Sequence, residues 1–352
     1  MNFVQKIIDK AKHSPTQLPT RISIPSENIS SKDKVGVPFE SEKYYFQIRI
    51  NELFLKDKRN WYKEFAPMVF VVSQYTYNGK EETVPFVVGP QIMDKFGQSL
   101  PNDMIFLNTR VAGLHPFRGG QITLSIILYQ YKVGDYSERI LRTLESTANI
   151  FSFATAFDTY IKIAGVIFEG VESLLGLQDV NPLIGLRIQM DEDADDLRSG
   201  YFALINVPEG TIDENKLWVK NNQLLYGDSI ANAKPYRDAD YTLYSILHDD
   251  ARSDLSALPF HSLWQHVKKE AAVPGEDAEK STIANMVSLN QAILTSPDIT
   301  EKHALDLIVK YQNDVELIRN ALSRQAKRGD TVTGNTKMDK MRSKSLEILK
   351  KL

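Results

Sequence analysis

The stretch NTRVAGLHPFRGGQITLSIILYQYK, residues 108–132, decides the fold class that the sequence predicts. Its second half has the two-residue period of a β-strand. One face of this strand carries Ile122, Leu124, Ile126 and Leu128, and the other carries Ile127, Tyr129 and Tyr131. Because both faces are apolar, we expect residues 121–132 to form a central strand that is covered on both sides.

The segment LHPFRGG before this strand has three interpretations. It is a plain turn if Pro116 and the two glycines only supply the required backbone angles. It binds a small anion if the glycine amides and the arginines converge. The plain turn is the leading interpretation. Of the two functional ones, we favour a long hairpin tip that meets a protein partner, because loops on a rigid sheet often carry recognition. The predicted partner-binding residues are Arg110, His115, Phe117 and Arg118.

Residues 41–134 as a whole are β-rich. Asn78-Gly79 lies between two strand-like runs and is a strong signal for a hairpin with a type I′ turn. About five strands without intervening helices predict an antiparallel β-sandwich or small barrel, C2-like or jelly-roll-like in outline.

Residues 135–180 form a long apolar helical pattern, for which we expect a buried core helix. The alternative is a membrane-active or pore-forming element at 147–176. Four charged residues weaken it, since a central charge costs at least ~2.5 kcal/mol on insertion; they are Asp158, Lys162, Glu169 and Glu172. Residues 181–250 are again β-rich, with a turn at Asn221-Asn222, and either complete the first sheet or form a second one.

Residues 251–328 predict a helical C-terminal domain of two or three packed helices. An apolar stripe at helical spacing runs through Phe260, Leu263, Trp264 and Val267. Ser296-Pro297-Asp298 marks the expected start of the last helix. The predicted architecture is therefore α+β, with a helical bundle after the β-rich part.

Both ends of the sequence are short and amphipathic. Residues 1–12 predict a docking helix with Phe3, Ile7 and Ile8 on its apolar face, and the Pro/Ser/Thr-rich residues 13–40 predict a flexible linker. Residues 329–352 predict a basic tail in which Lys344, Ile348 and Leu349 contact a partner. Alternatively, the first helix folds back on its own core or meets a membrane surface, and the tail is solvated or binds anionic lipid or nucleic acid.

The composition restricts the class of function. The 352 residues include 42 basic and 45 acidic side chains, a net charge of −3, which gives no global field for nucleic acid. Cysteine is absent, which excludes disulfides and thiol chemistry. The first residues lack the features of a secretory leader, so we expect a cytoplasmic protein.

Two polar clusters are candidates for chemistry. Asp191, Asp193 and Asp195 alternate as in the opening of a calcium loop, but Asp196 and Phe202 stand where glycine and glutamate are required, so they are only a weak metal candidate. The segment LHDDARSD around His248 suggests a hydrolase with a dispersed Asp/His/Arg site. No nucleophile elbow, zinc helix or phosphate loop accompanies it, and we predict no cofactor.

These observations favour a non-enzymatic interaction or assembly protein. We expect a subunit of a larger multi-protein system of bacterial type, which associates with protein partners or with itself. Membrane activity and hydrolysis are the alternatives.

Overall fold

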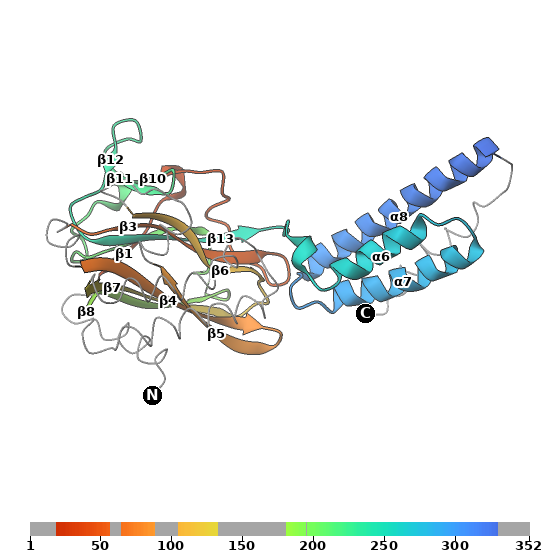
Figure 1. Cartoon of the computed structure of the whole chain (residues 1–352). Helices are drawn as coiled ribbons and strands as arrows, with labels where there is room; N and C mark the ends of the chain where they lie inside the picture. Colours follow the sequence, from red (N-terminus) through yellow and green to blue (C-terminus); the bar gives the residue numbers. More distant parts are fainter. Residues whose placement is uncertain (1–18, 57–64, 89–104, 133–180, 195, 330–352) are drawn as a thin grey trace. The chain divides into compact units, whose positions relative to one another are not determined.

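The computed structural model describes residues 19–56, 65–88, 105–132, 181–194 and 196–329 (Figure 1). The chain divides into two compact units, Met1–Arg252 and Ser253–Leu352. The described residues are mixed α+β and mostly sheet, with three α-helices, all in the second unit. The predicted N-terminal helix, the long helix at 135–180 and the tail after Gly329 lie outside the described residues.

The larger sheet of the first unit has five antiparallel strands in the order β1-β9-β13-β3-β6. Its strands are β1 (Thr20–Ser23), β9 (Gly200–Ile205), β13 (Tyr241–Asp249), β3 (Tyr45–Phe54) and β6 (Ile105–Pro116). The second β-rich segment therefore completes a sheet begun by the first.

The second sheet has four antiparallel strands in the order β5-β4-β7-β8. They are β5 (Lys80–Val88), β4 (Phe65–Tyr77), β7 (Gln121–Lys132) and β8 (Asn181–Asp191). Strand β7 lies between β4 and β8, which confirms its predicted central position, and Ile127 on its second face is fully buried.

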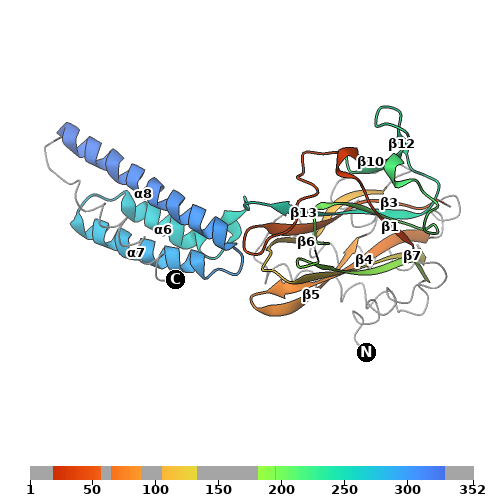
Figure 2. The same ribbon diagram turned by 180° about the vertical axis from the view of Figure 1, so that it is seen from behind.

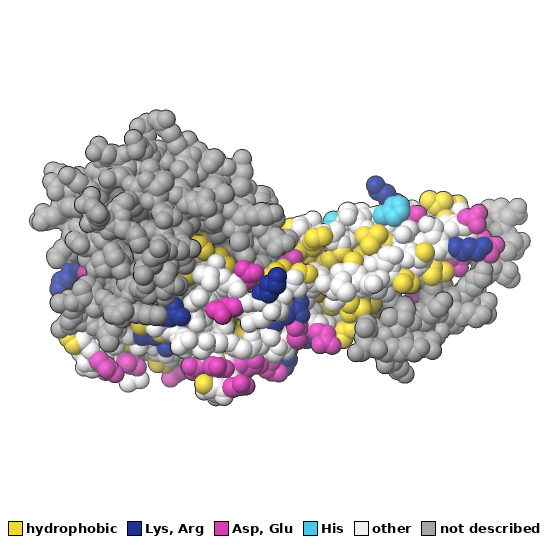
Figure 3. All heavy atoms as spheres, turned by 90° about the horizontal axis from the view of Figure 1, so that it is seen from below, with side chains coloured by type: hydrophobic (Ala, Val, Ile, Leu, Met, Phe, Trp, Pro, Cys, Tyr) yellow, Lys and Arg dark blue, Asp and Glu magenta, His cyan; other side chains and the backbone are white. Residues whose placement is uncertain are grey.

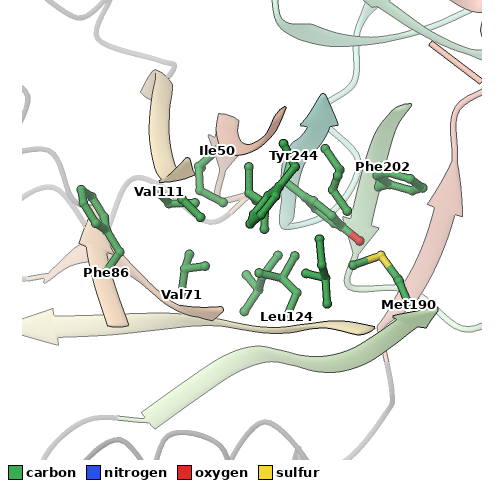
Figure 4. Close-up of a cluster of buried hydrophobic side chains, with 14 of the residues drawn as sticks. Ile50, Val71, Phe86, Val111, Leu124, Met190, Phe202 and Tyr244 are labelled. Carbon is green, nitrogen blue, oxygen red and sulfur yellow. The ribbon is translucent and has the colours of Figure 1, made fainter. Parts of the chain in front are cut away.

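One hydrophobic core takes side chains from both of these sheets. Figure 4 shows Ile50, Val111, Phe202 and Tyr244 of the five-stranded sheet pointing toward Val71, Phe86, Leu124 and Met190 of the four-stranded sheet. Both sheets end in edge strands in the described part of the chain, so the alternative of a closed small barrel is wrong for these residues.

The predicted hairpin at 114–120 is also wrong. Strand β6 pairs with β3 whereas β7 pairs with β4 and β8, so the turn between them crosses from one sheet to the other. His115 and Phe117 are only 1% and 2% exposed, because this crossover passes through the core instead of projecting from a sheet edge. Gly119 and Gly120 have φ of 82° and 78°, which explains the glycine pair as a backbone requirement.

The predicted flexible linker at 13–40 is wrong over its described part, residues 19–40. Strand β1 pairs with β9, and Ile22 and Ile24 are buried in a hydrophobic cluster that also includes residues of a small third sheet. That sheet has the order β12 (Lys234–Pro235), β11 (Gln223–Tyr226), β10 (Leu217–Lys220), β2 (Ile29–Ser30). The alternating apolar residues of TRISIP, residues 20–25, favour a strand, and this preference prevails over the Pro and Ser content that is typical of a linker.

Both predicted asparagine turns are confirmed. Asn78 and Gly79 have φ of 48° and 71° between the paired residues Tyr77 and Lys80. Asn221 and Asn222 have φ of 53° and 62° and join β10 to β11. Asparagine and glycine tolerate this left-handed region better than other residues.

The second unit contains α6 (His261–Ala271), α7 (Glu276–Leu294) and α8 (Glu301–Gly329), seen from behind in Figure 2. Its core includes the predicted residues Phe260, Trp264 and Val267, and Trp264 stacks on Tyr311 with ring centroids 4.0 Å apart. Helix α8 starts at Glu301, three residues after the predicted start, where the Thr300 hydroxyl accepts a hydrogen bond from the His303 amide.

Candidate functional site

The candidate site is a row of polar side chains on β3. Ile48 and Ile50 point into the core between the two larger sheets, so the alternating Gln47, Arg49 and Asn51 lie on the opposite face. We call these three residues and their hydrogen-bond partners the polar row. Gln47 and Asn51 are buried, and Arg49 is half-buried.

Arg49 is held in place by two neutral amides. Its Nε donates to Gln47 Oε1 at 2.8 Å, and its Nη1 donates to Asn108 Oδ1 of β6 at 3.2 Å. Gln47 Nε2 in turn donates to Asp249 Oδ2 of β13 at 2.8 Å, which orients the amide oxygen toward Arg49. The guanidinium is therefore positioned from three adjacent strands.

A second arginine stands beside this guanidinium. Arg49 is paired with Arg110 in the β3–β6 ladder, and paired residues of an antiparallel ladder share a face. Like charges at such positions are unfavourable, by on the order of 1 kcal/mol at close approach in water. The two arginine side chains therefore project from the same face of the five-stranded sheet.

The far end of the polar row is neutral or acidic. Tyr201 of β9 donates its hydroxyl proton to Asp33 Oδ2 at 2.7 Å, and burial together with this carboxylate raises the pKa of Tyr201. Asn51 Nδ2 donates to Asn222 Oδ1 at 3.3 Å. Asn51 Oδ1 is buried without a hydrogen-bond partner among the described residues, as is Ser245 Oγ of the neighbouring strand β13.

Glu52, the next residue on β3, belongs to an internal ion pair. Its Oε2 accepts the Leu224 amide proton at 2.7 Å, and its Oε1 lies 3.5 Å from Arg237 Nη2. Burial raises the pKa of Glu52, while the Leu224 hydrogen bond opposes that shift. Arg237 also lies over the Phe54 ring, 4.5 Å from its centroid. This group attaches β11 to β3, and we assign it a structural role.

The histidines of the predicted hydrolase site lie in aromatic surroundings. His115 contacts Phe46, Tyr75 and Tyr77, and burial, followed by the charges of Arg252 and Arg110, holds its pKa well below the usual value.

His248 lies against Tyr44 at a centroid distance of 4.5 Å and against Phe39 at 5.8 Å, and burial lowers its pKa. The packing of both rings explains these histidines as core residues.

The remaining predicted site residues are scattered. Arg118 forms an ion pair with Glu42, which lies just before β3 in the sequence. Phe117 packs edge-to-face on Phe39 with centroids 5.6 Å apart. The terminal residues of the predicted docking segments lie outside the described part of the chain; they are Phe3, Ile7, Ile8, Lys344, Ile348 and Leu349.

The acidic cluster after β8 forms a hydrogen-bonded turn. The Asp193 amide donates to Asp191 Oδ1 at 3.0 Å, and the Asp191 amide donates to Asp196 Oδ1 at 2.5 Å. Asp195 lies outside the described residues. Where the structure describes side chains, it gathers no group of three or more potential metal ligands.

Comparisons with known proteins provide no assignment. No protein-family model matches the sequence, and a search of curated proteins finds no significant match. Within the described ranges, no helix is both long and apolar enough to cross a membrane.

The sequence analysis missed the polar row, although the sequence carried a signal for it. The segment FQIRIN, residues 46–51, alternates apolar and polar side chains, which is typical of a strand with one polar face. The pairing of this strand with β6, which brings Asn108 and Arg110 to Arg49, is not visible in the local pattern.

Proposed function

We propose that this chain is a non-enzymatic interaction or assembly protein, a cytoplasmic subunit of a larger multi-protein system of bacterial type. Its first unit is a β-sandwich, C2-like or jelly-roll-like in outline, that presents recognition surfaces on a rigid framework. The core shared by the two larger sheets supports the sandwich. The helical unit supplies the surface that associates with protein partners or with a second copy.

The observation that carries this proposal is a set of three exposed apolar side chains on α8. Five residues of the helix face the core of the helical unit; they are Ala304, Leu307, Ile308, Tyr311 and Val315. Leu305, Val309 and Leu317 lie outside this core-facing side of the helix, with exposures of 39%, 54% and 67%. Hydrophobic side chains are visible on the surface of the helical unit in Figure 3.

These three residues would contribute substantially to an interface. Full burial of a Val or Leu side chain is worth about 1.5–3 kcal/mol relative to full exposure. Because the three are already partly covered, we expect a smaller gain from each. Their sum still suffices to make α8 a recognition helix of the kind that lies in a groove of a partner.

The experiment compares the full chain with the triple variant Leu305→Ser/Val309→Ser/Leu317→Ser. Light scattering over a range of concentrations reports self-association, and affinity purification with quantitative mass spectrometry reports stable partners. Val273→Ser is the matched control, since Val273 is 50% exposed and lies two residues after the end of α6, outside α8.

The proposal predicts an assembled species or a recovered partner that the triple variant loses and Val273→Ser retains. A wild-type chain that is monomeric at all concentrations, and that recovers the same proteins as the triple variant, would contradict the proposal.

A further inference from the structure

We propose that the basic amphipathic segment at residues 338–352 binds to one side of α7 in the same molecule. The proposal goes beyond the interaction role of α8, because it assigns an occupant to a different helix. We call this side of α7 the α7 stripe; its residues are Ile283, Val287, Asn290 and Leu294.

The α7 stripe lies directly beside the core-facing side of the helix. The buried residues of α7 are Thr282, Met286, Leu289 and Ile293. Each stripe residue is the next residue after one of these, so the stripe lies about 100° farther round the helix. Val287 is 44% exposed, and Ile283 and Leu294 are half-buried. The described part of the helical unit therefore leaves an apolar strip of α7 only partly covered.

Asn290 is a second and independent sign that the stripe has an occupant. Its Oδ1 is buried and has no hydrogen-bond partner among the residues that the structure describes. A buried acceptor without a donor costs about 1–3 kcal/mol, so native proteins rarely leave one. A segment from outside the described residues can supply this donor, and 338–352 carries hydroxyl and ammonium groups among its apolar residues.

The sequence of 338–352 matches an apolar stripe. At helical spacing, one side of the segment carries Met338, Met341, Ile348, Leu349 and Leu352. Its charged residues fall mainly on the other side. An isolated helix of this length is marginal in water, so it gains stability by packing on an apolar surface.

The place of this segment in the chain favours α7 of the same molecule. Arg319 of α8 donates to Val273 O at 2.9 Å, so this point of α8 lies near the start of α7. From Arg319 to Gly329 the helix rises about 15 Å. A flexible linker of eight residues, the number in 330–337, has a root-mean-square reach of about 16 Å. The linker therefore suffices to return Met338 to the start of α7.

A short tether also favours the same molecule over a second copy. It gives the segment an effective concentration in the millimolar range, which exceeds that of a second copy in dilute solution.

The residue spacing of the two segments agrees in this alignment. With Met338 level with Glu276, Leu349 is level with Val287, because both helices rise equally per residue and run in the same direction. Ser345 is then level with Ile283. The largest exposed apolar side chain of the α7 stripe thus meets the apolar side of the segment.

The charges of the two segments are complementary. The first turn of α7 is acidic at Glu276, Asp277 and Glu279, and the helix contains one basic residue, Lys280. The segment 338–352 contains five basic and two acidic side chains. Exposed ion pairs contribute at most about 1 kcal/mol each, so they set the alignment while apolar burial supplies the affinity.

The test is disulfide trapping in the full chain, which has no native cysteine. The test pair is Val287→Cys with Leu349→Cys. The control pair is Ser288→Cys with Leu349→Cys, because Ser288 is the next residue of α7, is exposed and lies off the stripe. Mild oxidation is followed by mass spectrometry of the linked peptides and by non-reducing gel electrophoresis, which separates monomers from dimers.

We expect the test pair to oxidise at least about tenfold faster than the control pair, and within a monomer. Docking holds the two thiols within disulfide range, whereas a tether alone favours the more exposed position of Ser288. Addition of Met341→Ser should slow the test pair to the rate of the control pair. Leu346→Ser is the matched control, since Leu346 lies off the apolar side of the segment, and it should change the rate by less than about twofold.

Equal rates for the test pair and the control pair would overturn the proposal. Disulfide-linked dimers in place of linked monomers would also overturn it, because the occupant of the α7 stripe would then be a second copy. The pair Ile283→Cys with Ser345→Cys replaces the test pair if Val287→Cys fails to fold, and the same two outcomes apply to it.

The α8 triple variant should retain the fast rate of the test pair. Loss of assembly through α8 and loss of docking on α7 are therefore distinguishable.

Discussion

Replacing Phe117 with alanine is the sharpest test of the crossover between the two sheets. Phe117 is 2% exposed and contacts Phe39 edge-to-face, and its amide donates to Tyr44 O at 2.8 Å. Truncation of a buried Phe to Ala typically costs about 3–5 kcal/mol, which includes the lost aromatic pair and the resulting cavity. At roughly 2–4 °C per kcal/mol for a domain of this size, the melting temperature of the first unit should fall by about 6–20 °C.

The assay is urea and thermal unfolding of the first unit, followed by tryptophan fluorescence in a Trp264→Phe background. The two remaining tryptophans, Trp61 and Trp218, both precede the boundary at Arg252. Arg118→Ala is the control, because its half-buried ion pair with Glu42 should contribute about 1 kcal/mol at most. A loss below about 1 kcal/mol for Phe117→Ala would refute the buried crossover and restore an exposed tip.

Three other predictions follow from the side-chain packing inside each unit. Because burial lowers the pKa of His115 in the folded state, the stability that its neutral form provides is present above the unfolded pKa and is lost as the pH falls below it; His115→Phe should reduce the slope of unfolding free energy between pH 7 and 5 by up to about 1.4 kcal/mol per pH unit, measured by urea unfolding. Gly113→Ala should destabilise more than Gly120→Ala in the same assay, because a Cβ at Gly113 would overlap the Phe46 carbonyl oxygen whereas a Cβ at Gly120 meets nothing within 4 Å, and both glycines have positive φ. Trp264→Ala should lower the stability of the helical unit by about 3–5 kcal/mol, followed by helical circular dichroism, and leave the first unit unchanged.

Local patterns in the sequence predicted the individual elements well. The alternation over 121–132 identified β7 as central, and the two asparagine turns were located correctly because their left-handed backbone restricts the residue types. The apolar stripe from Phe260 to Val267 identified the inner face of α6. In each case the signal lies within a few consecutive residues.

Properties that depend on distant pairing could not be predicted from these patterns. Pro116 and Gly119-Gly120 suit a hairpin as well as a crossover, and only the pairing of β6 with β3 distinguishes the two. The composition of residues 19–40 is typical of a linker, yet strand β9, nearly two hundred residues later, pairs with β1 and orders it. Arg49 becomes a candidate site only because β6 and β13 bring amide and carboxylate groups beside it.

The most direct test of the proposed assembly role is sedimentation velocity of the full chain over a wide range of concentrations, with its co-purifying partners and without them. The account predicts a concentration-dependent or partner-dependent complex that disappears in Leu305→Ser/Val309→Ser/Leu317→Ser and persists in Val273→Ser. The account would be contradicted if the wild type and the triple variant had the same sedimentation coefficient, that of a monomer, both with and without those proteins.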